Sequence, residues 1–194
     1  MSIGCTPRAQ TQTRSALLLI GCLAAAALAG CETPGPTSQP KRAPTPMQVA
    51  QMQTEPDIAA VVAIYNSTDP WIWTEDRSRV RGIVVGGLYL IGPDDKAVFG
   101  DGVIHPKLYL IEKDAEGRQK AVSAKEWSFD VDEALLLRSK KETTFGWGYL
   151  LPLDWGDLDL SGREIRMLIV FERSDGLVVK TKSPKHFRVP VGGV

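Results

Sequence analysis

The residue with the most specific chemical context in this sequence is Cys31. It follows Leu28, Ala29 and Gly30, so that a large aliphatic side chain and two small ones precede a thiol. A peptidase that cuts before the cysteine needs small side chains beside the bond it breaks, and a lipid transferase uses the thiol as its nucleophile. This spacing matches the lipobox of bacterial signal sequences. It predicts cleavage between Gly30 and Cys31 and attachment of a lipid such as palmitate to Cys31.

Tryptophan side chains form a second group that could do chemistry, by stacking on a ligand. Trp71 and Trp73 stand two residues apart, and Trp155 follows later in the chain. Aromatic faces stack on sugar rings and peptides, but they also supply large apolar areas to the ends of a core. Two interpretations therefore stand: a ligand-binding surface formed by Trp71, Trp73 and Trp155, or three residues of the core.

Aspartates form a third group, in the segment that leads to Gly162. Asp154, Asp157 and Asp159 fall within six residues. Calcium takes about 6–8 oxygen ligands from a flexible loop, but the spacing is not that of an EF-hand and no glutamate closes the loop. Aspartates also stabilise turns by accepting backbone N–H groups. We expect a structural turn here and no metal site, and the loop 92–102, with three further aspartates, has the same two interpretations.

Catalytic motifs are not found in this sequence. The two histidines, His105 and His186, each lie near a proline in or beside an expected strand. Neither stands in a His-Glu-x-x-His metal motif, and the chain has no Gly-x-Ser-x-Gly nucleophile motif or phosphate-binding glycine loop. We therefore predict no catalytic residues, no cofactor and no enzymatic activity.

The segments before the expected domain have the composition of a targeting sequence and a linker. Arg8 and Arg14 flank an apolar run over 15–28, which is shorter than the roughly 20 residues of a membrane-spanning helix. Six prolines then fall within 32–56, where 47–54 offers at most a helical turn without an apolar face. We expect this linker to be disordered and dispensable for folding. The predicted organisation is a signal peptide at 1–30, the lipidated cysteine with a proline-rich spacer at 31–57, and a folded domain at 58–194.

Charge and cysteine content narrow the class of partner. The chain has 23 basic and 23 acidic residues, and loss of Arg8 and Arg14 with the signal peptide leaves 21 and 23, a net charge of −2. Nucleic-acid-binding domains carry a clustered basic excess, so we expect no nucleic-acid partner. Cys5 and Cys22 leave with the signal peptide, so the mature chain has no disulfide. The predicted partners are a membrane, through the lipid on Cys31, and an envelope protein or glycan.

The remaining sequence predicts short strands. Apolar and polar residues alternate over 104–112 and 165–171, which is the period of half-buried strands, and Ser174-Asp175-Gly176 is typical of a hairpin turn. The apolar run 58–65 reads as a further strand, and Pro106 predicts that a strand starts at a sheet edge there. Asp130, with Glu133 three residues later, predicts a capping box and one short helix. Seven or eight such strands predict an all-β fold, an immunoglobulin-like or transthyretin-like antiparallel β-sandwich with one inserted helix.

Four runs of the chain carry a resemblance to known sequences: VFGDGVI at 98–104, LY at 108–109, WSF at 127–129 and GWGYLLPLD at 146–154. Together they resemble the C-terminal β-sandwich domain of uncharacterised bacterial lipoproteins, over most of 71–190. The resemblance implies a membrane-anchored envelope domain and no catalytic residues. The predicted function is therefore a lipid-anchored, non-enzymatic structural or interaction module of the cell envelope. The alternative is a lipoprotein that binds a small ligand or carbohydrate on its tryptophan-rich surface. Glu32, rather than an aspartate, after Cys31 favours the outer membrane over the inner one.

Overall fold

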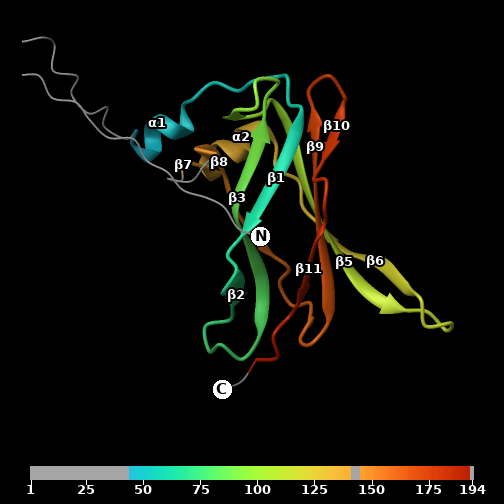
Figure 1. The fold of residues 1–194 in the computed structure, drawn as a ribbon. Coiled ribbons are helices and arrows are strands. Elements are labelled where there is room, and N and C mark those ends of the chain that lie inside the picture. Colours follow the sequence, from blue (N-terminus) through green and yellow to red (C-terminus); the bar gives the residue numbers. More distant parts are fainter. Residues whose placement is uncertain (1–43, 141–144, 193–194) are drawn as a thin grey trace, which may run out of the picture. The chain divides into compact units, whose positions relative to one another are not determined.

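The computed structural model describes residues 44–140 and 145–192, which form two antiparallel sheets around a shared core (Figure 1). The first sheet has the strand order β1 (Ala60–Tyr65), β3 (Val80–Ile91), β8 (Trp147–Asp154) and β7 (Arg138–Lys140), and both β2 (Trp71–Trp73) and β4 (Ala97–Val98) also pair with β3. The second has the order β10 (Val178–Lys180), β9 (Glu164–Arg173), β5 (Gly102–Lys113) and β6 (Gln119–Glu126), with β11 (Lys185–Arg188) also on β9. The predicted all-β antiparallel sandwich is confirmed.

Alternation along β9 supplies much of the core, as the sequence predicts. Ile165, Met167, Ile169 and Phe171 are each no more than 1% exposed. Their period of two puts them on one face of the strand, where they meet apolar side chains of the first sheet. The ring of Phe171 lies against Gly100, where an added Cβ would come within 2.5 Å of a ring atom. A glycine at that position therefore makes room for the largest side chain of β9.

The prediction that a strand begins at Pro106 is wrong, because β5 begins at Gly102 and passes through the proline. Pro106 lies opposite Ile169 of β9, and its carbonyl accepts the N–H of Trp127 at 3.0 Å. The backbone nitrogen and the carbonyl of a strand residue point to the same edge of the strand. The nitrogen of Pro106, which carries no hydrogen, therefore points toward Trp127 and away from β9. The ladder with β9 loses no hydrogen bond.

The predicted short helix is present, but its cap differs from the prediction. Helix α2 (Val131–Ala134) is followed by the 3₁₀ helix η1 (Leu135–Leu137), after which the chain enters β7. Asp130 is the N-cap residue, yet its side chain makes no capping hydrogen bond. The predicted capping box is therefore wrong, and the backbone at this end of the helix is held by the turn itself.

A capping box forms instead within the segment that the sequence assigned to the spacer. Thr45 precedes helix α1 (Pro46–Ala50), and its hydroxyl accepts the N–H of Gln48 while the Gln48 side chain accepts the N–H of Thr45. These bonds satisfy N–H groups that the first turn of a helix leaves free. The helix buries one apolar side chain, Val49, which is 3% exposed.

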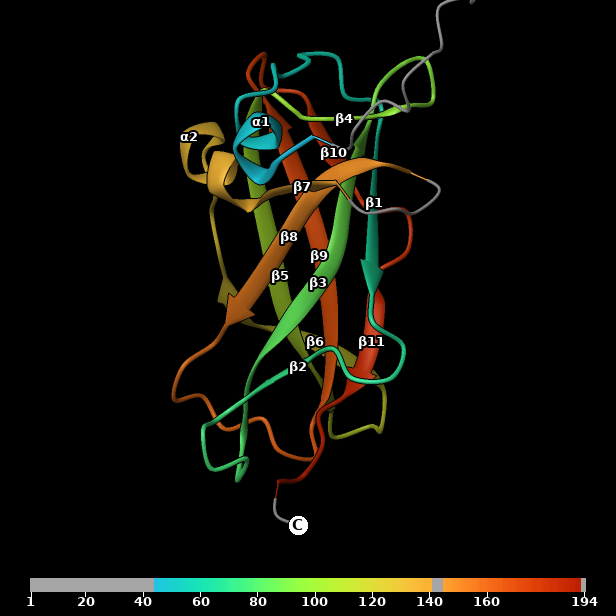
Figure 2. The same ribbon diagram turned by 90° about the vertical axis from the view of Figure 1, so that its left-hand side faces the viewer.

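Residues 44–57, here named the strap, are held against the sandwich beside β7 and η1 (Figure 2). The N–H of Glu55 donates to the carbonyl of Phe99 at 2.7 Å, and the N–H of Asp101 donates to the carbonyl of Glu55 at 3.1 Å. The guanidinium of Arg138 donates to the carbonyls of Ala50 and Met52. The predicted disorder of the linker is therefore wrong for 44–57, and the folded unit begins before residue 58. The rest of the predicted spacer lies outside the described residues.

Candidate functional site

A groove runs along one open side of the sandwich, where an edge of the first sheet faces an edge of the second. Strand β1 and the turn after it form one wall, and the chain from Thr181 to Arg188, which includes β11, forms the other. Figure 2 shows β1 and β11 along the same side of the molecule. Two adjoining hollows of about 420 and 300 Å³ make up this edge groove, and they share Ala63, Tyr65 and Lys185.

Three aromatic rings line the wider part of the edge groove. Phe187 of β11 makes edge contacts with Tyr65 of β1, at 4.9 Å between ring centroids, and with Trp71 of β2, at 5.8 Å. All three rings are partly buried and pack against the core. Burial raises the pKa of the Tyr65 phenol well above its ordinary value, so the hydroxyl stays protonated and remains a hydrogen-bond donor.

The charged side chains that line the edge groove are all basic. Lys182, Lys185 and Arg188 line it, and no aspartate or glutamate is among the described residues that do so. None of these three cations forms an ion pair with any described residue. In a chain with zero net charge, this is a local cationic surface beside apolar rings. It suits a ligand that combines anionic groups with flat or apolar faces.

The structure divides the three tryptophans that the sequence grouped. Trp71 lines the edge groove, whereas Trp155 is 3% exposed and belongs to the core. Trp73 is partly buried against the same core, with the Arg77 guanidinium 5.8 Å from its ring, and does not line the groove. The prediction of a ligand surface formed by all three is therefore wrong for Trp155, which is covered by other side chains. Of the three rings, Trp71 is the one placed to stack on a bound molecule.

Sequence reasoning missed Tyr65 and Phe187, the two aromatic residues that line the wider part of the edge groove with Trp71. Tyr65 closes an apolar run and reads as a core residue, and Phe187 comes from the far end of the chain. One signal was available: Lys180, Lys182, Lys185 and Arg188 are concentrated in the segment that carries Phe187. A cluster of basic residues around an aromatic ring is a surface pattern, because lysine and arginine are seldom fully buried without a partner.

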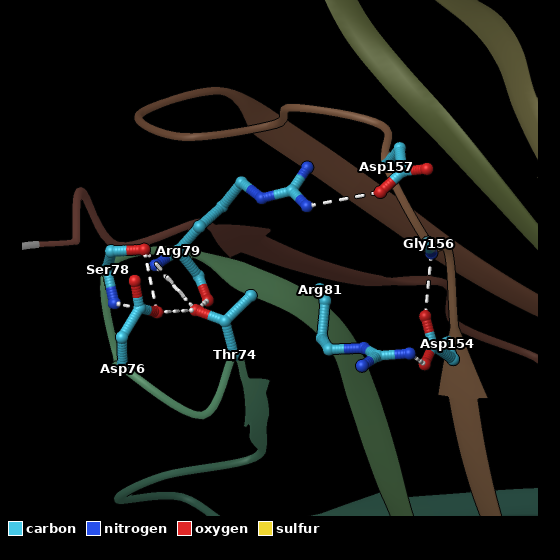
Figure 3. Close-up of polar contacts among 8 residues, drawn as sticks. All are labelled: Thr74, Asp76, Ser78, Arg79, Arg81, Asp154, Gly156 and Asp157. Atoms are coloured by element: carbon cyan, nitrogen blue, oxygen red, sulfur yellow. Dashed lines mark hydrogen bonds and ion pairs between the residues drawn. The ribbon is translucent and has the colours of Figure 1, made fainter.

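The acidic segment that begins at Asp154, the last residue of β8, is a turn with hydrogen bonds and ion pairs to its carboxylates (Figure 3). Asp154 accepts the N–H of Gly156 at 2.6 Å, and its second oxygen lies 2.5 Å from the guanidinium of Arg81. Asp157 lies 3.5 Å from Arg79. Further along, the Asp159 side chain accepts the N–H of Ser161 at 3.0 Å. Arginine side chains and backbone N–H groups therefore engage these carboxylates.

A second polar turn faces this segment. The carboxylate of Asp76 accepts the Thr74 hydroxyl at 2.7 Å and both the N–H and the hydroxyl of Ser78, at 3.1 and 2.8 Å (Figure 3). These hydrogen bonds, the one from Thr74 first, lower the pKa of Asp76 to about 2. In the described part of the chain, no three His, Cys, Asp or Glu side chains converge as metal ligands would.

Each histidine lies beside one carboxylate. The Nε2 atom of His105 lies 3.4 Å from a carboxylate oxygen of Glu172, and the Nδ1 atom of His186 lies 3.8 Å from one of Glu164. His186 and Glu164 flank an open hollow together with Phe187 and Arg188, both of which also line the edge groove. His186 and Glu164 are each about half exposed, and the described lining of that hollow includes no serine, threonine or cysteine that could act as a nucleophile.

The site with the most specific sequence motif, Cys31, lies outside the described residues, as does the whole predicted signal peptide. Within the described part of the chain, no helix is long and apolar enough to cross a membrane. No protein-family model, curated protein or solved structure matches this chain.

Proposed function

We propose that this chain is a lipid-anchored protein of the bacterial cell envelope whose β-sandwich is a non-enzymatic interaction module. The lipobox before Cys31 supports the anchor. The observation that carries the interaction role is the edge groove, where Tyr65, Trp71 and Phe187 stand beside cations that have no partner among the described residues. Rigid aromatic anchors and arginine are the side chains that most often dominate binding energy at protein surfaces.

The anchor is tested by incorporation of labelled palmitate in a bacterial host. We expect Cys31→Ala to abolish the label, because its thiol is the acceptor. Cys22→Ala is the matched control, since Cys22 lies upstream of the predicted cleavage site and leaves with the signal peptide. Label that persists in Cys31→Ala would refute the anchor. Fractionation of the labelled protein tests the outer-membrane location that Glu32 favours.

The interaction role is tested by crosslinking in intact cells. A photo-crosslinking amino acid in place of Thr68 would stand in the lining of the edge groove. The same amino acid in place of Glu116, at the turn between β5 and β6, is the control. We expect a crosslinked species from position 68 that is lost when Arg188→Glu is added, and none of the same mass from position 116. Equal products from both positions would contradict the proposal.

A second candidate function, carbohydrate binding, is favoured by one observation. The ring of Trp71 lines a hollow of about 420 Å³, which has room for a sugar ring stacked on the indole. A carbohydrate ligand and a polypeptide ligand would use different parts of the edge groove. A sugar needs the ring of Trp71 and polar side chains, whereas a polypeptide can also use the backbone of β1.

A further inference from the structure

The pairing of β3 shows which backbone groups of β1 are already used. Ile91 of β3 lies between Ala60 of β1 on one edge and Ala97 of β4 on the other. The N–H of the next residue, Gly92, donates to the carbonyl of Lys96, so Gly92 directs its backbone groups toward the β4 side. Successive residues of a strand direct these groups to opposite edges. Ile91 therefore directs its groups toward β1, and Ala60 directs its own toward β3.

The same alternation leaves Val61 and Ala63 with their N–H and carbonyl groups directed away from β3. Strand β1 pairs with β3 alone, and no backbone hydrogen bond links β1 to β10 or β11 among the described residues. The outward groups of Val61 and Ala63 therefore face the edge groove, whose lining includes both residues. One wall of the groove is an open strand edge.

This edge lacks the usual protection against pairing. Natural proteins block free edges with charged side chains, prolines or inward-pointing charges. Strand β1 has the sequence Ala-Val-Val-Ala-Ile-Tyr, with no charge and no proline, and its residue types favour strand pairing. The charges stand on the opposite wall instead, where Lys182, Lys185 and Arg188 face the groove.

We propose that the edge groove binds an extended, acidic polypeptide segment, which adds as a further strand to the free edge of β1. The backbone of the segment would pair with Val61 and Ala63, and its carboxylates would meet Lys182, Lys185 and Arg188. Main-chain bonds then supply affinity and the side-chain contacts supply specificity, as in other cases of strand addition. The proposal rests on the interaction role proposed above and names the class of partner.

Two other occupants fit less well. A second copy of this chain, paired edge to edge through β1, would bring two cationic walls close together, where like charges repel. A glycan could stack on Trp71, but it has no regular row of donors and acceptors to match the alternating backbone groups of a strand. An acidic polypeptide can pair its carboxylates with the basic side chains of the groove and its backbone with the free edge of β1.

The first test uses fluorescent synthetic peptides and the full chain in detergent, with binding measured by fluorescence anisotropy. The probe has about eight residues, enough to span β1 at roughly 3.3 Å per residue, with Asp and Glu alternating with Val and Thr. A second peptide has Lys in place of each acid. A third keeps the acids and carries N-methyl groups on the amides of one edge. We expect the second and third to bind at least about tenfold more weakly than the probe.

The second test changes the protein. Ala63→Pro removes the outward N–H without removing a donor to β3, and we expect about a tenfold loss of affinity for the probe. Lys185→Glu with Arg188→Glu should produce a similar loss, and a weaker dependence of the residual binding on salt. Lys113→Glu with Lys120→Glu, where β5 ends and β6 begins, is the matched charge control, because it reverses two exposed charges away from the groove, and it should leave binding unchanged. Circular dichroism melts establish that each variant is folded.

The outcomes separate this inference from the proposed function. Equal binding of the N-methylated peptide and the probe would overturn strand addition, even if Ala63→Pro fails to fold. The protein could instead bind polygalacturonate, lose that binding in Trp71→Ala, and fail to bind the acidic peptide. That result would overturn the proposal that the ligand is a polypeptide, but it would still support an interaction role. A dimer that dissociates in Ala63→Pro would assign the edge to a second copy. Failure of both probes, with no crosslink at Thr68, would refute the inference and the proposed function together.

Discussion

Replacement of Arg138 by alanine should release the strap from the sandwich. Arg138 is 7% exposed, its Nη1 atom donates to the carbonyls of Ala50 and Met52, and its guanidinium lies 4.6 Å from the centroid of the Phe99 ring. A hydrogen bond from a charged donor contributes about 1.5–3 kcal/mol, and a cation–π contact about 0.5–1 kcal/mol. Because one nitrogen makes both hydrogen bonds, their contributions overlap, and we expect a total loss of about 3 kcal/mol.

Urea denaturation and hydrogen exchange would measure this loss. The midpoint of Arg138→Ala should fall, and amides of 44–57 should lose protection while those of β9 keep theirs, because the strap detaches before the sheets separate. Arg138→Lys keeps the charge but not the planar fork of donors, so its loss should be smaller than that of alanine.

The control is Arg163→Ala, which removes an exposed ion pair with Glu112 at 2.8 Å. Pairs of this kind contribute less than about 1 kcal/mol. Equal midpoints for Arg138→Ala and Arg163→Ala, with unchanged exchange in 44–57, would refute the view that Arg138 holds the strap.

Three other perturbations have expected outcomes. Phe171→Ala should cost roughly 3–5 kcal/mol in thermal or urea unfolding, because its ring fills the space beside Gly100; an unchanged melting temperature would contradict the register of β9. Millimolar calcium should not shift the melting temperature, because partners already engage the Asp154–Asp159 carboxylates, whereas a micromolar site would add about 4 kcal/mol at a thousandfold excess of ion. Thr74→Val should raise the pKa of Asp76 from about 2 toward its ordinary 3.8 in an NMR titration. Since the folded-state pKa of Asp76 is lowered, its stabilising effect is present above about pH 4 and is lost as the pH falls toward 2, and an unchanged pKa in Thr74→Val would show that another group sets it.

The sheets are predictable from sequence because their signal is local. The residues of β9 alternate strictly, and the hairpin turn at Asp175 and Gly176 joins β9 to β10 as expected. Burial on one face of a sheet produces that period in any sandwich, whichever strands are neighbours. The all-β class therefore follows from the sequence without knowledge of the strand order.

The strap and the edge groove are not predictable in this way, because each depends on residues far apart in the sequence. Val49 is the one buried residue of helix α1, in a segment rich in prolines and glutamines, and that segment is fixed by Arg138, 88 residues beyond Ala50. The groove likewise needs Tyr65 and Phe187 side by side, and no periodicity links them. Its charge pattern depends on which basic side chains lack a nearby carboxylate, which only the three-dimensional arrangement reveals.

The second sheet cannot be completed until the end of the chain has been made. Strands β5 and β6 are consecutive and can form a hairpin early, but β5 also pairs along its other edge with β9, which comes much later in the sequence. Contacts between distant segments slow folding, and an unpaired strand in a partly folded chain is prone to aggregate. During synthesis, β5 therefore passes through a period in which one long edge is open. The time spent in that state, more than the final stability of the sandwich, should set how much of this protein reaches its folded form.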